Sequence, residues 1–120
     1  MTRDNTFDSE ETRRLCEAAC LVKTPEEALA FFADLLSPHE MSDLAQRLEV
    51  ATLLRSGRSY VDVSSVTGAS STTVSRVSKC LRGERGGYRL VLERLDGEPG
   101  AAGRANAEKA DGLGMQERQV

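Results

Sequence analysis

Six hydrogen-bond donors lie in one short stretch of this chain, and their spacing suits contact with DNA. Val74, Val77 and Leu81 recur at intervals of three and four residues, which predicts one buried stripe on a helix. The polar side chains outside that stripe can donate hydrogen bonds, and none is acidic: Ser70, Ser71, Thr72, Thr73, Arg76 and Lys79. Base edges in the DNA major groove present hydrogen-bonding groups to such a helix.

The preceding residues predict a shorter helix and a tight turn. Val63 and Val66 are expected to give that helix an inward face. Gly68 can adopt the positive φ that a sharp turn between helices often requires, and Ala69 is small where the helices must approach. We therefore interpret residues 59–79 as a helix-turn-helix.

The six donors are not expected to act alike. Ser70 and Ser71 are the best N-cap residues, so their hydroxyls are partly engaged within the protein. Thr72 is then the better candidate for a base contact. Arg76 can fork onto guanine or onto a phosphate, and Lys79, one turn further on, is expected to contact a phosphate.

The rest of the chain predicts further helices, so the fold is expected to be all-α with about six of them. Ser9, Thr24, Ser37 and Ser59 each have the type and position of a helix N-cap. A last helix is expected from Tyr88 to Leu95, with an inward face formed by Tyr88, Val91, Leu92 and Leu95.

The longest predicted helix, about Pro38 to Ser56, is apolar on more than one side. One face carries Met41, Leu44, Ala45, Leu48 and Ala51, and another adds Val50 and Leu53. A helix with apolar residues around most of its girth is buried on several sides. In a chain of 120 residues this predicts packing against a second subunit.

Composition divides the chain into three parts: a flexible N-terminus (1–8), one helix-turn-helix domain (9–95) and a disordered tail (96–120). Residues 1–46 carry four basic and ten acidic side chains, whereas residues 47–94 carry nine basic and four acidic ones. The proposed DNA-contacting helix therefore lies in the cationic part of a protein whose net charge is −3. Local cationic charge is what phosphate neutralisation requires.

The cysteines and the hydropathy favour a cytoplasmic protein. Cys16, Cys20 and Cys80 are an odd number, and no apolar run approaches the length of a membrane span. Cys16 and Cys20 are one helical turn apart, but a zinc site needs four ligands and His39 is the only histidine. We therefore expect small buried or half-buried side chains there, and no metal.

Four segments together resemble the bacterial Trp repressor family, and most closely its Trp-repressor-related branch. They are Ala45–Ala51, Leu53–Arg55, Thr67–Ser70 and Thr73–Arg76, within a similarity that covers roughly residues 15–95. The resemblance implies six helices, an intertwined homodimer and sequence-specific binding of double-stranded DNA by a transcription regulator.

The resemblance also raises the question of an amino-acid corepressor such as tryptophan. In the Trp repressor two arginines sandwich the indole, and the matching positions here are Arg47 and Arg76. Val77 stands where the repressor has a glycine, and Cys80 where it has a serine that helps to hold the ligand. These departures favour a different effector or none. Arg47 then serves in a salt bridge or a phosphate contact, and Arg76 in a DNA contact.

Two other classes of function make different demands on the sequence. An enzyme with a cysteine nucleophile needs a base, and the lone His39 follows Pro38 at a predicted helix start. With no glycine-rich loop or carboxylate pair, we predict that the protein is not an enzyme. A helical adaptor that binds only other proteins fits the acidic first half, and predicts no DNA binding even at low salt.

Overall fold

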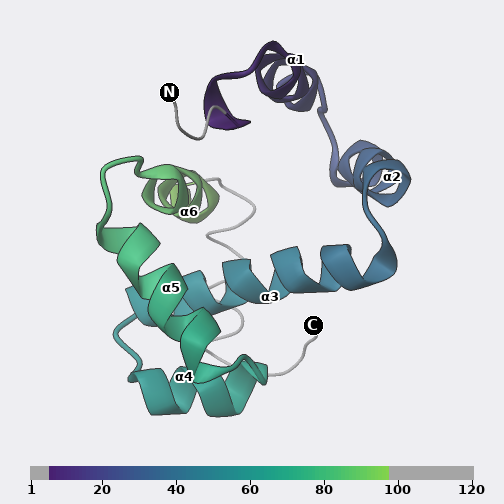
Figure 1. Ribbon diagram of the computed structural model, residues 1–120. Coiled ribbons are helices and arrows are strands. Elements are labelled where there is room, and N and C mark those ends of the chain that lie inside the picture. Colours follow the sequence, from purple (N-terminus) through teal and green to yellow (C-terminus); the bar gives the residue numbers. More distant parts are fainter. Residues whose placement is uncertain (1–5, 98–120) are drawn as a thin grey trace. The chain divides into compact units, whose positions relative to one another are not determined.

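The computed structural model describes residues 6–97, and over this range it is all-α, as predicted, without strands (Figure 1). Its elements are η1 (Thr6–Asp8), α1 (Glu10–Ala19), α2 (Pro25–Leu35), α3 (Pro38–Arg55), α4 (Tyr60–Thr67), α5 (Ser71–Arg82) and α6 (Gly87–Gly97). Residues 1–5 and 98–120, which hold most of the two predicted flexible ends, lie outside the described residues.

The predicted N-caps start the first three α-helices. Ser9 and Thr24 each accept a hydrogen bond from the backbone N–H three residues further on. At the start of α3 the bonds are reciprocal: Ser37 Oγ accepts from the Glu40 N–H at 3.2 Å, and Glu40 Oε1 accepts from the Ser37 N–H at 2.8 Å. The hydrogen bonds from Ser37 lower the pKa of the Glu40 carboxyl, because they favour its charged form.

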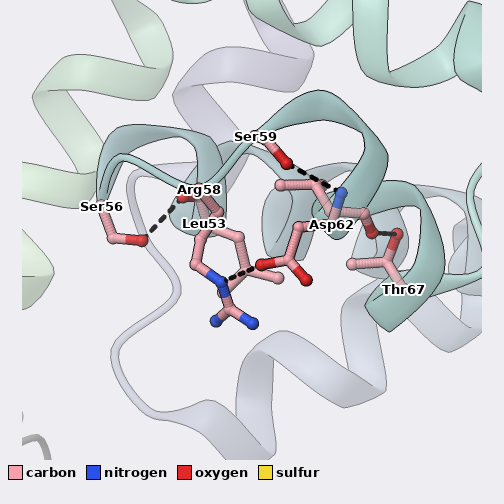
Figure 2. A network of polar contacts seen from close by, with 7 residues as sticks. Leu53, Ser56, Arg58, Ser59, Asp62 and Thr67 are labelled. Carbon is pink, nitrogen blue, oxygen red and sulfur yellow. Dashed lines mark hydrogen bonds and ion pairs between the residues drawn. The ribbon is translucent and has the colours of Figure 1, made fainter.

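The link between α3 and α4 is bonded to both helices (Figure 2). Ser59 Oγ accepts from the Asp62 N–H at 3.1 Å, so Ser59 caps α4 as predicted. Asp62, three residues after Ser59, has the position of a capping-box residue, but its carboxylate instead pairs with Arg58 Nε at 2.5 Å. Ser56 Oγ donates to the Leu53 carbonyl at 2.7 Å. These local bonds fix where α4 begins.

The chain divides into two units inside α3, between Leu44 and Ala45. The second unit holds the core, whose fully buried apolar residues are Val50, Ala51, Val63, Ala69, Val74, Val77 and Leu92. Helix α5 contacts α4 and α6 within this unit, and Figure 1 shows it running between them. The predicted inward stripe of α5 is therefore confirmed for its two valines, and Leu81 packs half-buried against the same core.

Three predicted inward positions in the second unit are exposed. Val66 on α4 is 55% exposed, because Val63 alone on that helix reaches the fully buried core. On α6, Leu92 is buried and Tyr88 is half-buried, but Val91 and Leu95 are exposed. Within a single chain, the buried face of α4 and of α6 is therefore narrower than the apolar spacing of each helix predicts.

The first unit has no fully buried side chain among its described residues. Leu29 on α2 is 60% exposed, and Leu15 on α1 is also exposed. Cys16 and Cys20, expected to be buried or half-buried, are both exposed free thiols. The apolar residues of α1 and α2 therefore form helices as predicted, but Leu15 and Leu29 are exposed in the single chain.

Helix α3 shows the same contrast along its own length. Val50 and Ala51 are completely buried, whereas Leu44 and Leu48, one turn apart, are 43% and 38% exposed. The predicted face that carries Leu44, Leu48 and Ala51 is therefore buried at Ala51 and exposed at the two leucines.

Candidate nucleic-acid interface

The turn between α4 and α5 is held by hydroxyl groups that bond to the backbone. Gly68 ends α4 with φ +78°, the left-handed conformation expected of it, and its N–H donates to the Ser64 carbonyl at 2.9 Å. Ser64 Oγ donates to the Ala69 carbonyl at 2.6 Å, and the Ala69 N–H donates to Thr67 Oγ1 at 3.1 Å. The hydroxyl groups of Ser64 and Thr67 therefore stabilise the turn.

A side chain of the long helix also contacts this turn. Gln46 Nε2 on α3 donates to the Thr67 carbonyl at 3.2 Å. Because this carbonyl lies at the end of α4, it has no helical partner of its own, and Gln46 satisfies it. No local pattern could indicate this contact, since the two residues are 21 positions apart.

Helix α5 is capped by Ser70, one of the two predicted cap residues. Ser70 Oγ accepts from the Thr73 N–H at 3.1 Å, and the same oxygen is 3.1 Å from Thr73 Oγ1. Ser71 is the first residue of the helix rather than its cap, and its side chain is exposed. The hydroxyls of Ser70 and Thr73 therefore bond to each other, while Ser71 and Thr72 face solvent.

This difference between neighbouring serines gives a testable prediction. We expect Ser70→Ala to lower the free energy of unfolding by about 1 kcal/mol, because an N–H at the helix start loses its acceptor. The matched variant Ser71→Ala should stay within about 0.5 kcal/mol of the parent. Urea denaturation followed by circular dichroism measures both. Equal losses in the two variants would contradict the assignment of the cap.

The outer face of α5 forms one side of an open groove. The groove has a volume of about 790 Å³ and is lined by Tyr60, Ser71, Thr72, Ser75, Arg76, Lys79 and Cys80. Arg76 and Lys79 are exposed and, among residues 6–97, neither is paired with a carboxylate. Their charges are thus available to an anion, while Val74 and Val77 on the opposite face are buried.

Tyr60 belongs to this groove, although sequence analysis did not single it out. It is the first residue of α4, and its hydroxyl donates to Ser78 Oγ on α5. Hydrogen bonding to Ser78 and then to Arg82 favours the phenolate and so lowers the pKa of Tyr60. The contact joins residues 18 positions apart, so no local pattern could have indicated it.

The two arginines of the predicted effector site are in different surroundings. Arg76 lines the groove, but Arg47 on α3 does not. Val77 is only 2% exposed, as expected of a side chain that fills space. Tyr88 is half-buried near Cys80 and Arg47; burial, with a smaller contribution from Cys80, raises the pKa of Tyr88.

His39, the possible metal ligands and the helix hydropathy bear on catalytic, metal-binding and membrane-spanning roles. His39 is exposed, with its Nε2 3.5 Å from Asp43 Oδ2 on the next turn of α3. Among residues 6–97, no three histidine, cysteine or acidic side chains gather closely enough to hold a metal ion. No helix in this range combines the length and apolar character of a membrane span.

Helix α4, the Gly68 turn and α5 define an all-α protein that carries a helix-turn-helix. Residues 10–96 match the family model described as Trp repressor protein. The chain therefore belongs to the Trp repressor family, as its sequence predicted. Membership of this family supports DNA binding and transcription regulation.

Bacterial relatives agree with this assignment. The uncharacterised protein YerC of Bacillus subtilis (strain 168) is 41% identical over 85 residues, which are 71% of this chain and 82% of YerC. A TrpR-like protein from Eubacterium eligens ATCC 27750 has a crystal structure with a TM-score of 0.69 and 40% identity, covering 77% of this chain and 95% of that one. A proposed Trp repressor from Staphylococcus aureus gives a TM-score of 0.72 and 30% identity, covering 82% and 98%.

Proposed function

We propose that this protein is a cytoplasmic transcription regulator, and specifically a repressor, that binds a palindromic operator as a homodimer. The observation that carries the proposal is the outer face of α5. Thr72, Arg76 and Lys79 are exposed there, and neither cation is paired with a carboxylate among the described residues. A helix with such a face suits the major groove.

The contacts within the second unit support different tasks for the residues of α5. Ser70 and Thr73 bond to each other at the helix start, so they are proposed to position the helix and to contact DNA only at its backbone. Ser71 and Thr72 are exposed in the first turn, which is the part of a recognition helix that contacts base edges. Arg76 follows one turn later and Lys79 nearly one turn after that.

The homodimer is supported by apolar surface that one chain leaves uncovered. The exposed side of α3 carries Leu44 and Leu48, and α2 adds Leu29 and Leu35. A second copy of the chain would remove these surfaces from water, at about 25 cal/mol for each Å² of apolar area. Two copies related by a two-fold axis would place two α5 helices in successive major grooves, about 34 Å apart.

The proposed regulator does not require tryptophan. Arg47 lies outside the groove that Arg76 lines, and the buried Val77 fills space beside Arg76. Arg76 is therefore proposed to contact DNA rather than an indole ring. We expect DNA affinity to be the same with and without free tryptophan.

Fluorescence anisotropy with a labelled random-sequence duplex tests the proposal. The protein should bind at 50 mM salt, and the affinity should fall steeply by 200 mM because binding releases counterions. A folded protein that shows no binding at 50 mM salt would instead support the adaptor that contacts only other proteins.

The salt dependence of one variant tests the role of Lys79. We expect Lys79→Ala to reduce the slope of log K against log salt by about 0.9 for each lost phosphate contact, or about 1.8 for a dimer. Lys23→Ala, in the acidic first part of the chain, is the matched control and should leave the slope unchanged. An unchanged slope for Lys79→Ala would show that Lys79 makes no phosphate contact in the complex.

A further inference from the structure

A second pocket lies in the same unit as the helix-turn-helix, and arginines dominate it. Its volume is about 380 Å³, and its polar lining consists of Arg55, Arg58, Arg82, Arg89, Tyr60 and Ser78. These residues come from the end of α3, the link before α4, the first residue of α4, the last turns of α5 and the start of α6. The function proposed above does not use this pocket.

Two of the four arginines are neutralised and two are not. Arg55 Nη1 lies 2.8 Å from Asp96 Oδ2, and Arg58 is paired with Asp62. Arg82 and Arg89 bond only to neutral oxygens, and neither has a carboxylate partner among residues 6–97. The pocket therefore carries two uncompensated positive charges in the described part of the chain.

The fold already holds both of these guanidinium groups. Arg82 Nη1 donates to Ser78 Oγ at 2.6 Å, and this buried hydroxyl also accepts from Tyr60. Arg89 Nη1 donates to the carbonyl of Leu81 near the end of α5. Each guanidinium has five N–H donors, so each keeps donors for a ligand after these bonds are made.

Gly86 is what allows Arg89 to lie across the turn between α5 and α6. It has φ +72°, and a Cβ atom at this position would come within 3.0 Å of Arg89 Nη2. A side chain there would both strain the backbone and push the guanidinium away. Because Arg82 and Arg89 are positioned before any ligand arrives, binding requires little further ordering of these long side chains.

We propose that this pocket binds the phosphate group of a small phosphate monoester. Guanidinium groups match the oxygens of phosphate through paired hydrogen bonds, and they keep their charge at any physiological pH. A phosphate monoester carries a charge between about −1.5 and −2 at pH 7, which balances the two unpaired arginines. The volume falls within the range of about 300–1,000 Å³ that is typical of small-molecule sites.

A phosphodiester of the DNA backbone offers related chemistry but only one negative charge, so it matches the two arginines less well. Binding of a small phosphate monoester does not depend on DNA binding, so a titration without DNA tests it independently. Tyr60 lines both this pocket and the groove beside α5, so the two sites are adjacent.

Isothermal titration of the full chain with glycerol 3-phosphate, at pH 7.5 and constant ionic strength, tests the proposal. We expect saturable binding by the parent, and at least a tenfold loss of affinity in the double variant Arg82→Gln/Arg89→Gln. The matched control Arg76→Gln/Lys79→Gln also removes two positive charges from the second unit, and should change the affinity less than twofold. Arg89→Lys keeps the positive charge but loses the paired N–H donors of the guanidinium, and should bind glycerol 3-phosphate with intermediate affinity.

Circular dichroism of each variant, and the same variants titrated with duplex DNA, make the outcomes distinct. Absence of saturable binding by the folded parent would overturn the proposal, as would equal losses in the two double variants. If only DNA affinity falls in Arg82→Gln/Arg89→Gln, the pocket receives a backbone phosphate and the small-molecule site is refuted. If glycerol 3-phosphate binds as expected while DNA does not bind, the phosphate site is supported and the proposed DNA-binding function is refuted.

Discussion

Replacing Arg76 with alanine should lower the affinity for operator DNA about 5- to 150-fold for each half-site of the proposed dimer complex. Arg76 is exposed on the outer face of α5, lines the groove and has no carboxylate partner among residues 6–97. A guanidinium forked onto guanine contributes about 1–3 kcal/mol of discrimination, which corresponds to this range of affinity. Fluorescence anisotropy with operator and random duplexes at one fixed salt concentration measures the change.

Two companion variants show whether the effect arises from geometry or from charge alone. Arg94→Ala removes the same charge from the exposed face of α6, and should change the affinity less than twofold. Arg76→Lys should retain binding to random DNA but lose preference for the operator, because an ammonium group cannot form the fork. Equal affinity for Arg76→Ala and the parent would exclude α5 as the recognition helix.

Introducing a charge on the uncovered side of α3 should separate the proposed dimer into monomers. Leu48 is 38% exposed in the single chain, so a second subunit is the expected cover for the rest of its surface. Covering the exposed 38% of Leu48 would contribute only about 0.6–1.1 kcal/mol, but a glutamate carboxylate buried there without a partner costs several kcal/mol, and a two-fold interface contains every residue twice. Leu48→Glu should therefore weaken dimerisation about 10²- to 10⁴-fold in sedimentation equilibrium.

The control for this variant is the most exposed of the large apolar side chains within residues 45–97. Val61, at the start of α4, is 81% exposed, and Val61→Glu should leave the dimerisation constant unchanged. Circular dichroism should show helical content equal to that of the parent for both variants. A parent protein that sediments as a monomer at micromolar concentration would contradict the homodimer.

Local patterns in the sequence predicted the helices well, because the groups that start and end them are adjacent in the chain. Ser9, Thr24, Ser37 and Ser59 each cap a helix through a bond to the N–H three residues later. Gly68 takes the predicted positive φ. Such interactions need only the spacing of a few residues, which is visible in the sequence.

Apolar periodicity predicted which helix faces are apolar, but not which neighbouring surface covers each face. Val74 and Val77 are buried within one chain, whereas Val66, Val91 and Leu95 are exposed. The pattern of apolar residues is the same whether the neighbouring surface belongs to the chain itself or to another subunit. Burial in a single chain therefore follows from tertiary arrangement, which spacing alone does not specify.

The polar contacts between distant residues were beyond the reach of local patterns. The bonds from Gln46 to the turn and from Tyr60 to Ser78 join different helices. The predicted DNA-contacting residues were therefore identifiable by type and spacing, whereas the residues that position them required the fold.

Selection of bound duplexes from a random pool, with and without free tryptophan, tests most directly the claim that α5 recognises DNA as one of a pair. The account predicts enrichment of an imperfect palindrome, with half-sites about 10 base pairs apart from centre to centre and no dependence on tryptophan. Arg76→Ala should lose the preference at one base pair in each half-site. A folded parent protein that enriches no sequence, even at low salt, would contradict the account.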